Sequence, residues 1–136
     1  MSNLSDLALG PTVVDITMTA GESLLARDVV YVAIGGGLTT GRAYKCNGSS
    51  SRMSTSSFYI GLVVSNISAG ATGTVRIMGA MTGFTVTAGA PQYASAATAG
   101  ALTETYVSGS LLVGMALDSG TVLINSFGDN TAITTA

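Results

Sequence analysis

The sequence contains no histidine and no tryptophan, and its single cysteine is Cys46. Without histidine the chain cannot build a Ser-His-Asp or Cys-His nucleophile system, and it lacks the commonest protein ligand of zinc and iron. One cysteine forms neither an intrachain disulfide nor a cysteine-based zinc site, so we expect Cys46 to be a small, buried apolar residue. These absences predict a protein that is not an enzyme and that uses no metal and no cofactor.

Charged residues are also scarce. They make up 9% of the chain, whereas a typical soluble domain is about a quarter charged. The five basic residues are scattered and the formal net charge is −2, which argues against nucleic-acid binding through phosphates. A surface with so few charges has little electrostatic protection against self-association. Two interpretations stay open: other copies or a partner cover much of the surface, or the chain is a small soluble β domain of low charge.

Long apolar runs are missing as well. No segment approaches the length of a membrane-spanning helix, and the first residues, Met1–Asp6, lack the basic and apolar regions of a secretory signal. We therefore expect a protein that is made in a cytoplasm and used there, or carried out of it inside a particle, without a membrane partner.

Strand signals dominate what is present, and helix signals are almost absent. Runs of β-branched residues alternate at short spacing with clusters of Gly, Ser, Thr and Asn. This pattern predicts an all-β fold, an antiparallel β-sandwich or barrel with little or no helix. We expect one β domain at 13–127, between an N-terminal arm at 1–12 and a C-terminal tail at 128–136. The predicted strands are Val13–Thr19, Asp28–Ile34, Arg42–Asn47, Tyr59–Asn66, Gly73–Gly79, Thr82–Thr87, Gln92–Ala96, Ala101–Thr105, Leu111–Asp118 and Thr121–Asn125.

Local patterns add detail to this prediction. The strand Gly73–Gly79 is expected to place its odd-numbered residues on one face and its even-numbered residues, Arg76 and Met78 among them, on the other. The segment Asp118–Thr121 predicts a tight hairpin turn in which Gly120 has a positive φ.

The two halves of the domain, 13–80 and 81–127, carry similar elements in the same order. Each has a Thr-Ala-Gly entry, a Tyr-bearing strand, a Leu-Thr return, a strand with glycine between apolar residues, and a Gly-Thr-Val strand. The order predicts two copies of one β unit that share a core; the alternative is coincidence in a chain rich in Gly, Ala and Thr. The matched elements are Thr19–Gly21 and Thr87–Gly89, Val29–Val32 and Gln92–Ser95, Leu38–Thr39 and Leu102–Thr103, Ile60–Ser65 and Val113–Asp118, and Gly73–Ile77 and Gly120–Ile124.

Three motifs suggest ligand binding or catalysis, and each has a simpler explanation. Gly35–Arg42 lacks the spacing of a phosphate loop, and no helix pattern follows it. Leu117–Gly120 has the hydrophobic-Asp-Ser-Gly form of aspartic proteases, but only sixteen residues follow it, and a hairpin turn explains it. Asp15, Asp28 and Asp118 could chelate calcium only if the fold brings them together. The carboxylates also form no pair that the sequence can place for glycoside hydrolysis.

A family resemblance covers most of the chain, from Thr17 to Ser126. The stretch Ala20–Val32 resembles an A-G-E-x-L-x-x-G-D-V-V-Y-V entry, and Thr87–Leu117 resembles the series G-x-P-x-Y-x-S, T-A-G-x-L-T and V-G-x-A-L. Both patterns are common in virion proteins of tailed phages. The chain therefore resembles head decoration (cement) proteins, head fibres and modules of tail fibres.

The resemblance implies an antiparallel β domain that forms homotrimers and binds the capsid surface. It implies no catalytic residues. Arg27 stands where these proteins have a glycine before Asp28, so the turn there is expected to differ.

On this basis we expect a structural virion protein, a capsid decoration (cement) protein that binds the outer surface of a phage head and stabilises the shell. Its expected partners are the major capsid protein and its own copies, with no nucleic acid, membrane or small-molecule substrate. The alternative is a tail-fibre or other host-recognition module of a phage, which predicts an exposed aromatic platform for sugars. A hydrolase is the third class, and the missing histidine argues against it.

The interaction candidates come from three segments. The arm before the first strand has three leucines that could order on a neighbouring subunit, although a frayed terminus explains it equally well. A Ser-rich loop at Gly48–Ser57 is the best candidate for a contact-making loop. The candidate residues are Leu4, Leu7, Leu9, Arg42, Arg52 and Met53.

Overall fold

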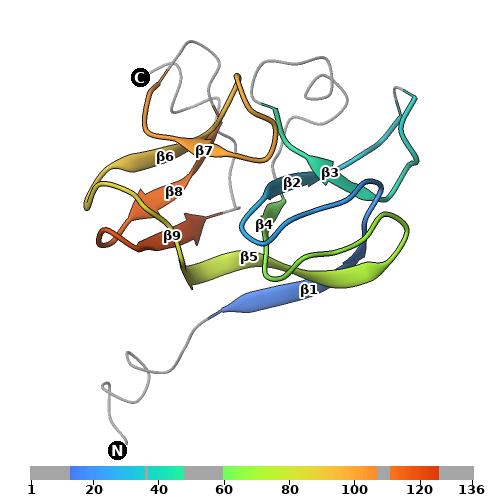
Figure 1. The fold of residues 1–136 in the computed structure, drawn as a ribbon, viewed down its shortest axis with the longest axis horizontal. Helices are drawn as coiled ribbons and strands as arrows, with labels where there is room; N and C mark the ends of the chain where they lie inside the picture. Colours follow the sequence, from blue (N-terminus) through green and yellow to red (C-terminus); the bar gives the residue numbers. More distant parts are fainter. Residues whose placement is uncertain (1–12, 36, 48–59, 107–110, 126–136) are drawn as a thin grey trace, which may run out of the picture.

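The computed structural model of the chain describes residues 13–35, 37–47, 60–106 and 111–125. In this part of the chain the fold is all-β, as predicted. Nine strands form one antiparallel sheet that curls into a half-barrel, and no helix is present there (Figure 1). The predicted arm and tail lie outside the described residues, so the domain boundaries stay predictions. The strands are β1 (Val14–Thr19), β2 (Val29–Val32), β3 (Ala43–Lys45), β4 (Gly61–Val63), β5 (Thr72–Thr82), β6 (Pro91–Ala94), β7 (Leu102–Thr103), β8 (Leu112–Ala116) and β9 (Thr121–Asn125).

The long strand β5 lies at the centre of the sheet. The strand order is β3-β2-β4-β5-β9-β8-β6-β7, and β1 pairs with β5 outside this order. Figure 1 shows β2, β3 and β4 grouped on one side and β6 to β9 on the other, with β5 and β1 beneath them. β5 therefore connects two groups of strands.

β5 differs from the two strands predicted at Gly73–Gly79 and Thr82–Thr87. The chain does not break near Gly79, because this part of β5 pairs with β9 over five consecutive residues. The residues after β5 form no strand. Phe84 and Val86 instead donate backbone hydrogen bonds to the β8–β9 turn, over 3.1 and 3.0 Å.

A β-bulge in β5 changes which residues share a face. Asp15 pairs with Arg76 and its neighbour Val14 pairs with Met78, so Ile77 is an extra residue opposite β1. Paired residues lie on the same side of a sheet, and consecutive residues lie on opposite sides. Arg76 and Met78 therefore point to opposite sides, and the predicted common face of the even-numbered residues is wrong from Met78 onward.

The two halves of the chain have the same strand pairing. In the first, β2 pairs with β3 and β4, and β4 pairs with β5; in the second, β6 pairs with β7 and β8, and β8 pairs with β9. The registers match as well, since Leu62 pairs with Arg76 as Met115 pairs with Leu123. The ordered repeat in the sequence thus corresponds to a repeat of strand topology, and we refer to its halves as the first and second unit.

The return strand of the repeat was aligned incorrectly from the sequence. β7, Leu102–Thr103, matches Ala43–Tyr44 of β3 rather than Leu38–Thr39. The pairing decides this, because Tyr31 pairs with Tyr44 in the first unit as Tyr93 pairs with Thr103 in the second.

The entry turn was also aligned incorrectly. Thr87–Gly89 matches Leu25–Arg27 rather than Thr19–Gly21, since the Gly89 N–H donates to the Ala116 carbonyl (2.8 Å) as the Arg27 N–H donates to the Val63 carbonyl (2.7 Å). The two turns have similar φ values, 82° at Gly89 and 72° at Arg27. At Arg27 an arginine thus adopts a left-handed conformation that suits glycine better.

One hydrophobic core is shared by the two units. A second, smaller core lies on the other side of the first unit, where Leu24 and Ile67 cover Val30, Val63 and Val75. Cys46 is fully buried, as predicted, and burial raises the pKa of its thiol to about 12. The shared core contains Val29, Tyr31, Ala33, Tyr44, Cys46 and Leu62 from the first unit, and Met81, Ala94, Val113 and Ile124 from the end of β5 and the second unit.

Candidate interaction surface

Four apolar residues form a row across four strands, on the side of the sheet that faces away from the shared core. Ala80 of β5 pairs with Leu123 of β9, and Leu123 pairs with Met115 of β8. Met115 pairs in turn with Pro91 of β6. Because directly paired residues lie on the same side of a sheet, these side chains form one continuous strip.

β1 extends the strip to a fifth strand. Val14 pairs with Met78, which lies two residues before Ala80 on the same side of β5. None of the residues in the strip carries a charge, and neither does the neighbouring pair Thr82–Thr121. We name the strip the uncharged face and define it as Val14, Met78, Ala80, Pro91, Met115 and Leu123.

Met78 is half-buried, and the other large side chains of the uncharged face are open to solvent. Met115 is 46% exposed, and Val14 and Leu123 are each 39% exposed. Clusters of exposed apolar residues mark sites where proteins or ligands bind. A groove of about 280 Å³ is lined by Gly89, Pro91, Leu112, Gly114, Met115 and Leu123.

The same face of the first unit is buried. Val29 and Leu62 hold the positions of Pro91 and Met115 in the repeat, since each forms the equivalent cross-strand pair. Val29 and Leu62 are nevertheless fully buried in the shared core. The second unit therefore exposes a face that the first unit buries against the rest of the chain.

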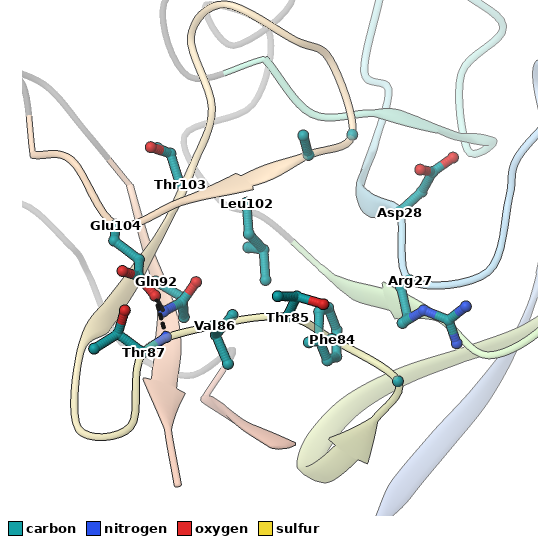
Figure 2. A pocket seen from close by; sticks show the side chains of 13 residues that line it. Arg27, Asp28, Phe84, Thr85, Val86, Thr87, Gln92, Leu102, Thr103 and Glu104 are labelled. Atoms are coloured by element: carbon teal, nitrogen blue, oxygen red, sulfur yellow. Dashed lines mark hydrogen bonds between the residues drawn. The ribbon is translucent and has the colours of Figure 1, made fainter. Parts of the chain in front are cut away.

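A cleft of about 510 Å³ lies where the two units meet (Figure 2). The turn Arg27–Asp28 lines one end, the linker Gly83–Thr87 lines one side, and Glu104, just after β7, lies at the other end. Between the two ends the lining mixes apolar side chains, such as Phe84, Val86 and Leu102, with polar ones, such as Thr85 and Gln92.

Glu104 is held at its end of the cleft by two hydrogen bonds. The Thr87 N–H donates to Oε2 over 2.6 Å, and the Gln92 Nε2 donates to the same oxygen over 3.1 Å. The bond from Thr87, and after it the bond from Gln92, lowers the pKa of Glu104 and favours its ionised form. Glu104 therefore ties the linker and β6 to the end of β7.

The opposite end of the cleft is built around Arg27. Gly83 lets the guanidinium lie close to the linker, since a Cβ at Gly83 would come within 2.6 Å of Nη1. Burial raises the pKa of Asp28, whose Oδ2 accepts the Leu25 N–H over 2.8 Å.

The cleft offers groups for ion pairing and hydrogen bonding. Its carboxylates, Asp28 and Glu104, lie at opposite ends (Figure 2), and each accepts a backbone hydrogen bond. Its described lining includes no Ser, Cys, Lys or His, and its side-chain hydroxyls belong to Thr85, Thr87 and Thr103.

Of the six predicted interaction residues, Arg42 is the one that the structure describes. It is half-buried in the turn between β2 and β3, where its carbonyl accepts the Ala33 N–H over 3.0 Å. This turn belongs to none of the strands of the uncharged face, so the structure does not bring Arg42 into that face. The other five candidates, Leu4, Leu7, Leu9, Arg52 and Met53, lie outside the described residues.

The aspartates considered as calcium ligands have other partners. Asp15 accepts two hydrogen bonds from the Arg76 guanidinium, over 2.9 and 3.2 Å. Asp118 Oδ1 accepts the Gly120 N–H over 2.8 Å. Within the described ranges no group of three Asp, Glu, Cys or His side chains could hold a metal ion.

The predicted hairpin turn between β8 and β9 is confirmed, but its mechanism is different. Gly120 is not among the glycines with positive φ. The Asp118 side chain closes the turn through its bond to the Gly120 N–H, and this bond lowers the pKa of Asp118. The protease-like motif thus has a structural explanation.

The uncharged face was missed in the sequence, although a signal was present. β8 and the residue after it read Leu-Val-Gly-Met-Ala-Leu, and β9 reads Thr-Val-Leu-Ile-Asn. A strand with one solvated face alternates apolar and polar residues, whereas these strands are apolar at consecutive positions. Such a pattern is typical of strands that are covered on both faces.

Comparison of the chain with protein-family models and with curated proteins gave no match. Within the residues that the structure describes, no helix is long and apolar enough to span a membrane. The resemblance to phage virion proteins therefore stays a prediction from the sequence.

Proposed function

We propose that the chain is a structural virion protein, a capsid decoration (cement) protein that binds the outer surface of a phage head and stabilises the shell. The observation that carries this proposal is the uncharged face, an exposed apolar strip across five strands of the sheet. A chain that works by itself in solution gains nothing from such a face, whereas a chain that works in an assembly can cover it. The sequence resemblance to head decoration proteins supports the same function.

Repetition explains how a small protein can stabilise a large shell. A single protein–protein contact of standard size buries about 1,600 Å² and yields useful affinity only when it packs well. A decoration protein repeats its contact at every equivalent position of the head and adds buried area across the joints between capsid subunits. The summed effect opposes the internal pressure of the packaged DNA.

The test is binding of the purified chain to bare phage heads that lack any decoration protein. We expect the chain to co-sediment with the heads at a fixed ratio to the major capsid protein, and the decorated heads to survive heating better than bare ones. Absence of binding to bare heads at both low and high salt would refute the proposal.

A second candidate, a host-recognition module of a phage tail fibre, is supported by one pair of aromatic rings. Tyr106 is 45% exposed, and its ring lies 5.5 Å from that of Tyr93 in an edge-on arrangement. An exposed tyrosine of this kind can stack on a sugar. Binding of the chain to host glycans that is lost in Tyr106→Ala, without binding to heads, would favour this function over decoration.

A further inference from the structure

We infer that the uncharged face is where one copy of this chain contacts another. The inference rests on the proposed function in one respect, that the chain works in an assembly, and it names the partner that covers this face. The partner that covers the face is a second copy of the chain rather than a capsid protein.

The first argument is electrostatic. Copies related by a symmetry axis bring the same residues together near that axis, so a charged surface there would meet its own charge and be repelled. The uncharged face carries no charged side chain along its length across β1, β5, β9, β8 and β6. It is therefore compatible with its own copy, in a chain that has seven acidic and five basic residues elsewhere.

The second argument comes from the repeat. Val29 and Leu62 occupy the positions of Pro91 and Met115, and both pack into the shared core against residues of the second unit, such as Ile124. In the first unit, this face of the repeat is thus covered by the shared core. In the second unit no described segment lies over this face in the way that Leu24 and Ile67 cover the other side of the first unit. A second copy can give it the kind of cover that the shared core gives the first unit.

The third argument is the shape of the strip. Its central residues, Ala80, Leu123, Met115 and Pro91, are direct cross-strand neighbours, so the strip follows one line across the sheet. A groove of about 280 Å³, lined in part by Gly114 and Leu123, lies beside Met115. Methionine is flexible enough to fill an irregular groove of this kind on a neighbouring copy.

The experiment compares the mass in solution of the full chain and of two matched double variants. Met115→Lys with Leu123→Lys places charge at the centre of the face, and Leu25→Lys with Ile34→Lys places the same charge on exposed apolar residues outside it. We expect a multiple of the 13.5 kDa chain mass for the unmodified chain and for the control, measured by light scattering over a range of concentrations. We expect self-association at least tenfold weaker for the variant in the face. Circular dichroism verifies that each variant is folded.

A cysteine variant keeps the inference testable if the charged variant fails to fold. Cys46 is fully buried, so the new thiol of Met115→Cys is the accessible one among the described residues. We expect mild oxidation to link two chains of Met115→Cys through a disulfide, and not to link Ile34→Cys. Equal cross-linking of the two variants would overturn the inference.

The outcomes separate this inference from the proposed function. A chain that stays a monomer at all concentrations but binds heads refutes the contact between copies and leaves decoration intact, with a capsid protein then covering the face. A chain that self-associates through Met115 and Leu123 but never binds heads supports the inference and refutes decoration. An unchanged mass in the Met115→Lys, Leu123→Lys variant overturns the inference.

Discussion

Gly61 and Gly114 hold equivalent positions in the two units, and a side chain at either position would collide with the neighbouring strand. A Cβ on Gly61 would lie 2.1 Å from the Arg76 carbonyl oxygen, and a Cβ on Gly114 would lie 2.0 Å from the Leu123 carbonyl oxygen. Both obstacles are backbone atoms of a neighbouring strand, which cannot rotate away as a side chain can. The glycine between apolar residues is therefore a requirement for close approach of the strands rather than a turn signal.

We predict that Gly61→Ala and Gly114→Ala each destabilise the fold. Overpacking of this kind costs typically about 1–3 kcal/mol, and a clash with backbone belongs at the upper end. Urea unfolding followed by circular dichroism measures the change. Gly120→Ala is the matched control, because its Cβ would have no contact closer than 3.7 Å and its φ is not positive; a loss as large in the control would contradict the explanation.

Arg27 is a second residue at which the repeat reveals strain. It adopts a φ of 72°, where its counterpart Gly89 has a φ of 82°. A left-handed conformation costs a residue with a side chain about 1–2 kcal/mol. Replacing the arginine by glycine removes this cost, but glycine loses more conformational entropy on folding, which offsets part of the gain. We predict that Arg27→Gly raises the free energy of unfolding by up to about 1 kcal/mol.

Arg27→Ala is the control for this prediction. It removes the guanidinium and keeps a side chain at the strained position, so we expect no gain in stability from it. If Arg27→Gly and Arg27→Ala change the free energy of unfolding equally in urea titrations, backbone strain is not the cause.

At the scale of the elements, two carboxylates add side-chain connections to those of the strand ladders. Asp15 and Arg76 join β1 to β5 in a two-point ion pair beside the bulge, and a third nitrogen of Arg76 donates to the Ala80 carbonyl over 3.0 Å. Glu104 joins the end of β7 to the linker through Thr87. Asp15 was considered from the sequence as a calcium ligand, whereas Glu104 was not singled out.

The Glu104 connection predicts a dependence of stability on pH. Its pKa in the folded state lies below the ordinary value, so its contribution to stability is present at neutral pH and is lost as the pH falls through the folded-state pKa. We expect the free energy of unfolding to decrease from about pH 5 to about pH 3. Glu104→Gln should lose less over the same range, and an identical pH slope in the two proteins would exclude this role.

At the scale of the whole molecule, the shared core makes the two units interdependent. Leu62 of the first unit and Ile124 of the second are both fully buried in this core. The units also exchange backbone hydrogen bonds, from the Val29 N–H to the Gly100 carbonyl and from the Gly100 N–H to the Cys46 carbonyl, over 2.9 and 2.8 Å. The repeat therefore does not make two independent domains.

We predict that the chain unfolds in one transition and that Leu62→Ala and Ile124→Ala each lower the stability of the whole. Large-to-small changes at buried sites cost about 2–5 kcal/mol. Calorimetry and urea unfolding should show a single transition that shifts in both variants, whereas Leu25→Ala, at an exposed site, should leave it in place. Two separate transitions, with each variant affecting one of them, would contradict a common core.

The strands were predictable from the sequence to the extent that they follow local rules. β9 was predicted with its observed bounds, Thr121–Asn125, and β1 was predicted to within one residue at its start. The continuation of β5 through Gly79 was not predicted, because glycine in isolation suggests a break and the pairing with β9 that removes it lies some forty-five residues away in the sequence. The bulge at Ile77 was missed for the same reason, since it exists only relative to β1.

The sequence by itself determined that the chain is all-β, that its halves repeat, and that histidine chemistry and an intrachain disulfide are excluded, because composition and short-range periodicity are local properties. The tertiary structure decided which apolar surfaces are covered. Leu62 and Met115 sit at the same position of the repeated unit, yet one is fully buried and the other is 46% exposed. Burial depends on which distant segments pack together, and the residue pattern within one strand does not specify those segments.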